Sequence, residues 1–176
     1  MALHKDFPKS PHDILIPEIR WFPADEALRE SSMDKLMPPL VATLRRKVRE
    51  FRDGGYAGAS DTSKSLLNWW FKEPHLLPRL DGAAEEFRYF FAQREALETI
   101  VYLYDVVGAR DKFDLMRFDS SGMVSAQLFD ETWRRYVIKM ATGSGKTKVM
   151  SLALAWSFFH KTYEPDSALA RNFLVI

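Results

Sequence analysis

The sequence predicts an α/β fold in which a βαβ unit at the C-terminal end follows a mainly helical N-terminal region. Three observations support this. Apolar residues recur at helical spacing over 38–53, 62–71 and 93–106. A strand-forming run over 136–140 precedes a turn of small residues and an apolar helix over 148–160. The closing run over 172–176 is continuously apolar, which is typical of a parallel strand covered on both faces.

The composition is that of a globular protein and excludes several classes of function. The 176 residues are 47% hydrophobic and 28% charged, which excludes a disordered tail. A net charge of +1 means that any nucleic-acid contact would need a local basic patch. Cysteine is absent, so no disulfide, thiolate zinc site or cysteine nucleophile can form. Because we find neither a signal peptide nor a membrane-spanning run, we expect a cytoplasmic protein.

The first 83 residues are expected to be mainly helical after an extended lead-in. Four prolines within residues 1–35 exclude a long helix there. Leu40, Leu44 and Val48 place an apolar stripe on a helix over 38–53 that two glycines terminate. Its basic residues indicate either a phosphate-contacting helix or a solvated basic face, and we favour the solvated face. These residues are Arg45, Arg46, Lys47, Arg49 and Arg52.

A second short helix is expected over 62–71, with Asp61 as its cap and Pro74 as its stop. Its aromatic residues favour a core position over a surface that stacks on nucleic-acid bases. A third helix is expected over 93–106, whereas residues 85–91 fit a strand or a helix equally well. Residues 108–132 form a polar stretch without a period, which predicts a surface excursion.

The stretch that carries chemistry is Met-Ala-Thr-Gly-Ser-Gly-Lys-Thr at 140–147. Gly143 and Gly145 allow the backbone to wrap an anion with its N–H groups, and the following helix adds the positive end of its dipole. Lys146 supplies a cation for terminal phosphates, and the Thr147 hydroxyl is the expected magnesium ligand. The small hydroxyl residues Thr142 and Ser144 complete the loop. The alternative is a glycine-rich turn with a surface lysine.

This stretch resembles motif I of superfamily 2 helicases, with Met140 in the place of the first glycine. The run over 139–156, with Phe-Ala-Gln-Arg-Glu-Ala at 91–96 and the apolar run over 172–176, is similar to the Res subunit of type III restriction enzymes. The resemblance covers residues 85–176 well and the first 80 only loosely. It implies that residues 84–176 begin a RecA-like ATPase domain of a protein that moves along duplex DNA.

The resemblance also implies ATP and Mg²⁺ as cofactors and a modification (methyltransferase) subunit as a partner. Gln93 takes the place of a glutamine that, in many relatives, pairs with adenine through its amide. The alternative is a surface-exposed glutamine at the start of a helix.

Hydrolysis requires a carboxylate for magnesium, a second group that orients water and an arginine. After Lys146 the only carboxylates are Glu164 and Asp166, so we predict no catalytic residue in this chain. We therefore expect the ATP-binding N-terminal portion of a larger, helicase-type protein. The alternative is a non-catalytic nucleotide-binding or interaction subunit that works with a separate chain. A P-loop kinase is disfavoured, because no arginine-rich lid follows the motif.

Overall fold

The structure, a computed structural model, describes residues 40–80, 82–109, 111–119, 122 and 137–174. These residues divide into two compact units. One contains the described residues of 40–47 and 111–122, and the other contains those of 48–109 and 137–174. The expected lead-in over 1–35 and most of the expected excursion over 108–132 lie outside the described residues.

The described residues of the smaller unit are mostly helical. Helix α3, Val41–Asp53, starts in this unit and confirms the helix expected over 38–53. Helix α6, Lys112–Met116, lies inside the stretch that was expected to lack periodic structure. The Asp111 carboxylate caps it by accepting hydrogen bonds from the backbone N–H groups of Phe113 and Asp114. Five helical residues are too few to produce a hydrophobic period, so the sequence pattern did not reveal this helix.

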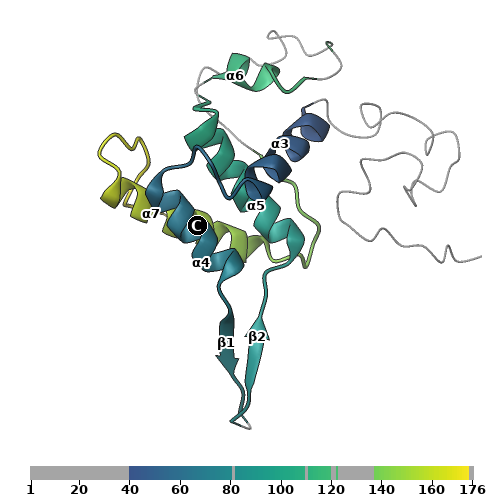
Figure 1. The fold of residues 1–176 in the computed structure, drawn as a ribbon, viewed down its shortest axis with the longest axis vertical. Helices are drawn as coiled ribbons and strands as arrows, with labels where there is room; N and C mark the ends of the chain where they lie inside the picture. The colour runs from purple at the N-terminus through teal and green to yellow at the C-terminus, as the bar shows by residue number, and fades with distance from the viewer. Residues whose placement is uncertain (1–39, 81, 110, 120–121, 123–136, 175–176) are drawn as a thin grey trace, which may run out of the picture. The chain divides into compact units, whose positions relative to one another are not determined.

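The larger unit is built on three helices that pack against one another: α4, Asp61–Lys72; α5, Phe91–Val101; and α7, Lys146–Tyr163 (Figure 1). Helix α5 continues into a π-helical turn, η3, Tyr102–Val106. These elements confirm the helices expected over 62–71, 93–106 and 148–160. The cap of α4 is Ser60 and not Asp61, because the Ser60 hydroxyl accepts the Ser63 N–H.

The core of this unit lies between the three helices. Leu67, Leu97 and Val101 are fully buried there. The other members of the core cluster are Phe51, Tyr56, Ala59, Trp70, Leu152 and Trp156. Of the aromatic residues expected in the core from the helix over 62–71, Trp70 is a core residue and Phe71 packs against the core, whereas Trp69 is 58% exposed.

A two-stranded antiparallel hairpin connects α4 to α5 and projects from these helices (Figure 1). Strand β1, His75–Pro78, pairs with β2, Ala84–Phe87, so that His75 lies opposite Phe87. The segment 85–91, which the sequence left undecided, therefore begins in β2, continues without regular structure over 88–90 and ends at the first residue of α5. Leu76 and Leu77 of β1 are more than half exposed, so the hairpin is not a buried sheet.

Of the expected βαβ unit, the described residues contain the helix but neither of the two strands. The strands predicted over 136–140 and 172–176 are wrong for the described residues 137–140 and 172–174, which have no strand conformation. In the described part of the chain, only β1 and β2 form a sheet. A strand requires a neighbour for its ladder of hydrogen bonds, and these two segments have none there. Val137 and Leu174 accordingly remain 79% and 85% exposed.

A buried ionic network joins the end of α3 to α5. Glu98 is fully buried, and its carboxylate accepts hydrogen bonds from the guanidinium groups of Arg52 and Arg94. The Tyr56 hydroxyl donates to the same carboxylate over 2.7 Å. Burial, and then the adjacent Glu98 charge, raise the pKa of Tyr56. A buried carboxylate is tolerated here because two cations and a phenol satisfy it.

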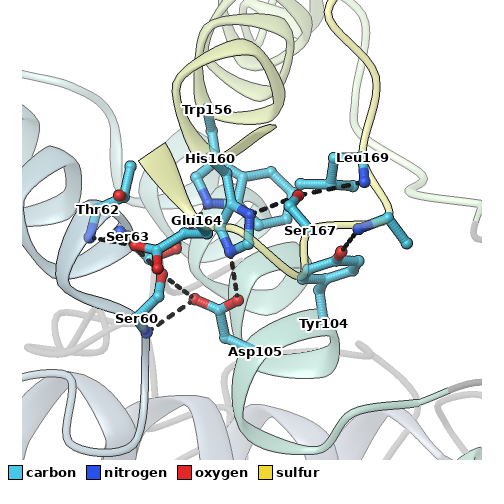
Figure 2. A network of polar contacts seen from close by, with 11 residues as sticks. Ser60, Thr62, Ser63, Tyr104, Asp105, Trp156, His160, Glu164, Ser167 and Leu169 are labelled. Carbon is cyan, nitrogen blue, oxygen red and sulfur yellow. Dashed lines mark hydrogen bonds and ion pairs between the residues drawn. The ribbon is translucent and has the colours of Figure 1, made fainter. Parts of the chain in front are cut away.

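A second buried polar network fastens the C-terminal end of α7 (Figure 2). The Asp105 carboxylate, on η3, accepts hydrogen bonds from the Ser60 N–H over 3.1 Å and from the Ser60 hydroxyl over 2.9 Å. The other Asp105 oxygen lies 3.0 Å from Nε2 of His160. Nδ1 of His160 lies 2.8 Å from the Ser167 hydroxyl. One carboxylate therefore connects η3, the start of α4 and the end of α7.

Two further contacts support this C-terminal end. The Thr62 N–H donates to the Glu164 carboxylate over 3.0 Å, and the hydrogen bonds from Thr62 hold the pKa of Glu164 below its ordinary value. Nε1–H of Trp156 donates to the Ser63 hydroxyl over 2.8 Å, inside the core (Figure 2). The C-terminal half of α7 and the residue that follows it are thus attached to the first turn of α4 by two hydrogen bonds.

Candidate functional site: a phosphate loop at the start of α7

The glycine-rich stretch forms a tight loop that leads directly into α7. The φ angles of Gly143 and Gly145 are 80° and 82°, a left-handed conformation that strongly favours glycine. The Ser144 side-chain hydroxyl donates to the Ala141 carbonyl over 2.6 Å, and the Ser144 N–H donates to the same oxygen over 3.3 Å. The two glycines and this turn reverse the chain before Lys146 begins the helix.

The first N–H groups of α7 are available to a ligand. Gly145 is the N-terminal cap, and no side chain caps the helix. Within the described residues, the N–H groups of Gly145, Lys146 and Thr147 donate to no backbone carbonyl. Unsatisfied donors and the positive end of the helix dipole lie together at such a terminus, which is the combination that binds phosphate groups.

The Lys146 ammonium group lies back over the loop. Its Nζ donates to the carbonyl oxygens of Met140 and Ala141, each over 3.2 Å. The residue itself is exposed, so solvent and ligands can reach it. A phosphate oxygen carries more negative charge than a carbonyl oxygen and can replace these two acceptors. The loop therefore places one mobile cation beside unsatisfied backbone donors.

The structure brings Gln93 to this loop from α5. The Gln93 side chain is buried, with an exposed fraction of 6%, which excludes the alternative of a surface glutamine. Its Nε2 donates to the Ser144 carbonyl over 3.0 Å, and its Oε1 accepts the Phe90 N–H over 3.1 Å. Of the residues predicted for nucleotide binding, Gln93 is the one distant in sequence, and the fold places it against Ser144.

The remaining loop residues present small polar side chains. Thr142 and Thr147 are exposed, and Ser144 is half-buried by its turn. The Thr147 hydroxyl is on the first turn of α7, one residue after Lys146. In the described ranges, no three His, Asp or Glu residues are grouped so that they could hold a metal ion. Thr147 thus stays the predicted magnesium ligand, with phosphate and water as the expected further ligands.

The two carboxylates that follow the loop in sequence are not near it. Glu164 follows the last residue of α7 and bonds to Thr62 on α4. A helix of 18 residues is about 27 Å long, so this carboxylate lies at the opposite end of α7 from Lys146. Asp166 follows in the same turn. Neither is positioned to orient a water molecule at a phosphate bound by the loop.

Three basic residues of α3 have contacts within the described residues that involve no ligand. Arg52 points inward to the buried Glu98 carboxylate. Nε of Arg46 donates to the backbone carbonyl of Ala42, and Arg49 lies 3.6 Å from Asp53 in an exposed pair. These contacts favour the interpretation of α3 as a structural helix with a solvated basic face over that of a phosphate-contacting helix.

Sequence reasoning did not identify the residues of the two buried networks as a set. Glu98, Asp105 and His160 have no motif spacing, because several of their partners are distant in the sequence: Glu98 is 42 residues from Tyr56 and 46 from Arg52, and Asp105 is 55 residues from His160. A charged residue on an otherwise apolar helix face, such as Glu98 beside Leu97 and Val101, was the one available signal. As for membranes, the described helices include none that is both long enough and apolar enough to span a bilayer.

A comparison with known protein families matches the C-terminal half of the chain, which contains the loop. A family model for the type III restriction enzyme Res subunit matches residues 86–176, which are 91 of the 176 residues. The matched region includes α5, the loop and α7. Neither the curated proteins nor the solved structures contain a match to the chain.

Proposed function

The chain belongs to the family of type III restriction enzyme Res subunits, and on this premise we propose that its loop over 141–147 binds the triphosphate of ATP together with Mg²⁺. The observation that carries the proposal is the position of the Lys146 ammonium group. It lies over a glycine loop whose last N–H groups are unsatisfied at the start of an 18-residue helix. A cation and convergent backbone donors are what a chain of phosphates requires.

Each loop residue has a separate role in this proposal. Gly143 and Gly145 give the backbone the conformation in which its N–H groups surround an anion. Lys146 exchanges its two carbonyl acceptors for terminal phosphate oxygens, and the Thr147 hydroxyl ligates the metal ion. Thr142 and Ser144 keep the loop small. Gln93 lies against Ser144 and contacts the loop from the α5 side.

We further propose that residues 84–176 begin a RecA-like domain and that the chain is the ATP-binding portion of a DNA-dependent helicase or translocase. Duplex DNA and a modification subunit are the partners that the family suggests. The two carboxylates that follow the loop in the sequence do not serve hydrolysis in this proposal, because Glu164 is held at the far end of α7 and Asp166 follows it. We therefore propose that this chain alone binds ATP without turning it over.

Calorimetry with a non-hydrolysable ATP analogue and Mg²⁺ tests the binding proposal. Lys146→Ala should weaken binding at least about tenfold, because the variant loses a charge-assisted contact to phosphate. Lys148→Ala is the matched control, since it removes the same charge one position after Thr147. The Lys148 ammonium lies 5.7 Å from the centre of the Phe87 ring and not over the loop. Equal affinities of Lys146→Ala and the wild type would remove Lys146 from the site.

A further inference from the structure

The contacts of Gln93 suggest a role for it that does not involve the base. We propose that Gln93 is a positioning residue that fixes the peptide between Ser144 and Gly145, so that the Gly145 N–H points to the bound phosphates. The proposal rests on the proposed function of the loop and assigns the part that α5 plays in it. Reading of adenine by the same amide is the competing role that the experiment must separate.

On the side of α5, the amide orientation is fixed by the helix itself. Gln93 is the third residue of α5, and its Oε1 accepts the Phe90 N–H over 3.1 Å. This contact is one half of a capping box, in which the third residue satisfies the N–H of the cap residue. With Oε1 directed back to Phe90, the Nε2 group must point away from the start of α5. The cap therefore aims the donor at the loop.

On the side of the loop, that donor controls a peptide plane. Nε2 donates to the Ser144 carbonyl over 3.0 Å. The C=O of Ser144 and the N–H of Gly145 belong to one planar trans peptide, so they point in opposite directions. A carbonyl held towards Gln93 consequently turns the Gly145 N–H away from Gln93. Within the described residues this N–H has no backbone acceptor, which leaves it for a ligand.

Close packing reinforces the contact. A Cβ atom added at Gly145 would lie 2.1 Å from Nε2 of Gln93. The φ of 82° favours glycine at 145, and any larger residue there would displace the Gln93 amide from its contact with the loop. Only 6% of Gln93 is exposed, so the amide is enclosed between the start of α5 and the loop.

The same geometry disfavours simultaneous reading of a base. An amide that pairs with adenine presents its oxygen and one N–H to the same partner. In this structure the oxygen faces the Phe90 N–H and the nitrogen faces the Ser144 carbonyl. Pairing with a base would break the contact to the cap, the contact to the loop, or both. The existing contacts therefore favour the loop as the partner of Gln93.

The variant Gln93→Glu separates capping from positioning. A glutamate retains an oxygen for the Phe90 N–H and suits the first turn of a helix. It also replaces the donor that faces Ser144 with a second oxygen, which repels the Ser144 carbonyl. Asn68→Asp on α4 is the matched control, because it makes the same amide-to-acid change away from the loop. Thermal unfolding of both variants checks that the fold is retained.

Calorimetry of the full chain with Mg²⁺ then uses three probes: an ATP analogue, a GTP analogue and inorganic tripolyphosphate, which has no base. We expect Gln93→Glu to weaken all three by the same factor, about tenfold, and Asn68→Asp to weaken none. A loss confined to the ATP analogue would assign Gln93 to the base and overturn the proposal. Unchanged affinity for all three probes would also overturn it.

A ligand-free measurement keeps this proposal separate from the proposed function. In ¹H–¹⁵N spectra without nucleotide, Gln93→Glu should move the Gly145 amide resonance, and Asn68→Asp should leave it unchanged. If this shift occurs while the wild type binds none of the three probes, the positioning contact is supported and nucleotide binding by the loop is refuted. An unmoved Gly145 resonance in Gln93→Glu would refute the positioning contact itself.

Discussion

The polar side chains at the two ends of α7 differ in their exposure and in their hydrogen-bond partners. At its start, Lys146 and Thr147 are exposed, and within the part of the chain that the structure describes the ammonium group bonds to two carbonyl oxygens of its own loop. At its end, the His160 and Asp105 side chains are 6% and 4% exposed and bond to each other across elements. Polar groups at the first end remain exchangeable, whereas those at the second end are committed to the fold.

The free-energy cost of breaking a polar contact explains this difference, because it is larger for buried groups than for exposed ones. A buried polar or charged group that loses its partner raises the free energy of the folded state, so removing one member of the networks around Glu98 and Asp105 should lower the stability of the chain. Exposed groups lose little when a contact changes, so the loop can exchange carbonyl acceptors for a ligand. Substitutions in the networks should therefore change stability, and substitutions in the loop should change binding.

The largest expected effect is that of Glu98→Ala. The variant leaves the guanidinium groups of Arg52 and Arg94 and the Tyr56 hydroxyl without their common acceptor. Removal of one partner from a buried ionic network costs about 3–5 kcal/mol of unfolding free energy, measured by urea titration. Glu86→Ala is the control, because the Glu86–Arg88 pair is exposed and should not change the midpoint. A Glu98→Ala midpoint equal to that of the wild type would contradict the role of this network.

Asp105→Ala should have the next largest effect on stability. It removes the acceptor of two donors of the half-buried Ser60, and it leaves the buried His160 ring without its Asp105 partner. We expect a loss of about 2–3 kcal/mol by urea titration. Asp105→Asn should lose less, because its amide oxygen can still accept from Ser60. The affinity of the folded fraction for the ATP analogue should be unchanged. A loss of affinity in Asp105→Ala would show that the C-terminal end of α7 is coupled to the loop at its start.

A smaller effect should appear as pH dependence at Glu164. Hydrogen bonds from Thr62 lower the pKa of Glu164 in the folded state, so this group adds stability above its unfolded pKa, near the usual 4.5. That contribution is lost as the pH falls through the lower, folded pKa. Urea titrations at about pH 6 and about pH 3 should show a difference between wild type and Glu164→Gln that shrinks with acidity. A difference that grows at the lower pH would contradict the sign of this shift.

Helices and the glycine-rich loop could be predicted from the sequence, because they depend on residues that are close together in the chain. The apolar spacing of Leu97 and Val101 predicted α5, and the small residues before Lys146 predicted the loop and the start of α7. The strands over 137–140 and 172–174 were not found, because strand formation depends on neighbours that an apolar run does not specify. The hairpin was missed for a similar reason, since the residues of β1 and β2 alternate too weakly to show a buried face.

Contacts between residues distant in the sequence could not be predicted for the candidate site either. The loop residues were identified by their spacing, and Gln93 by resemblance, yet its contact with Ser144 spans 51 residues and appears only in the fold. The Asp105 and Glu98 networks have the same origin. Each is assembled from residues of three segments: the Glu98 network from the end of α3, the turn after it and α5, and the Asp105 network from η3, the start of α4 and the end of α7.

The most direct test of the central claim is a titration of the ¹⁵N-labelled chain with tripolyphosphate and Mg²⁺, followed by the backbone amide resonances. If the loop surrounds a phosphate chain, the resonances of Gly143, Gly145, Lys146 and Thr147 should move together with one dissociation constant. Those of Asp105 and His160, at the other end of α7, should not move. Loop resonances that stay in place at saturating tripolyphosphate, or shifts that appear only around His160, would contradict the proposal that the loop binds a phosphate chain.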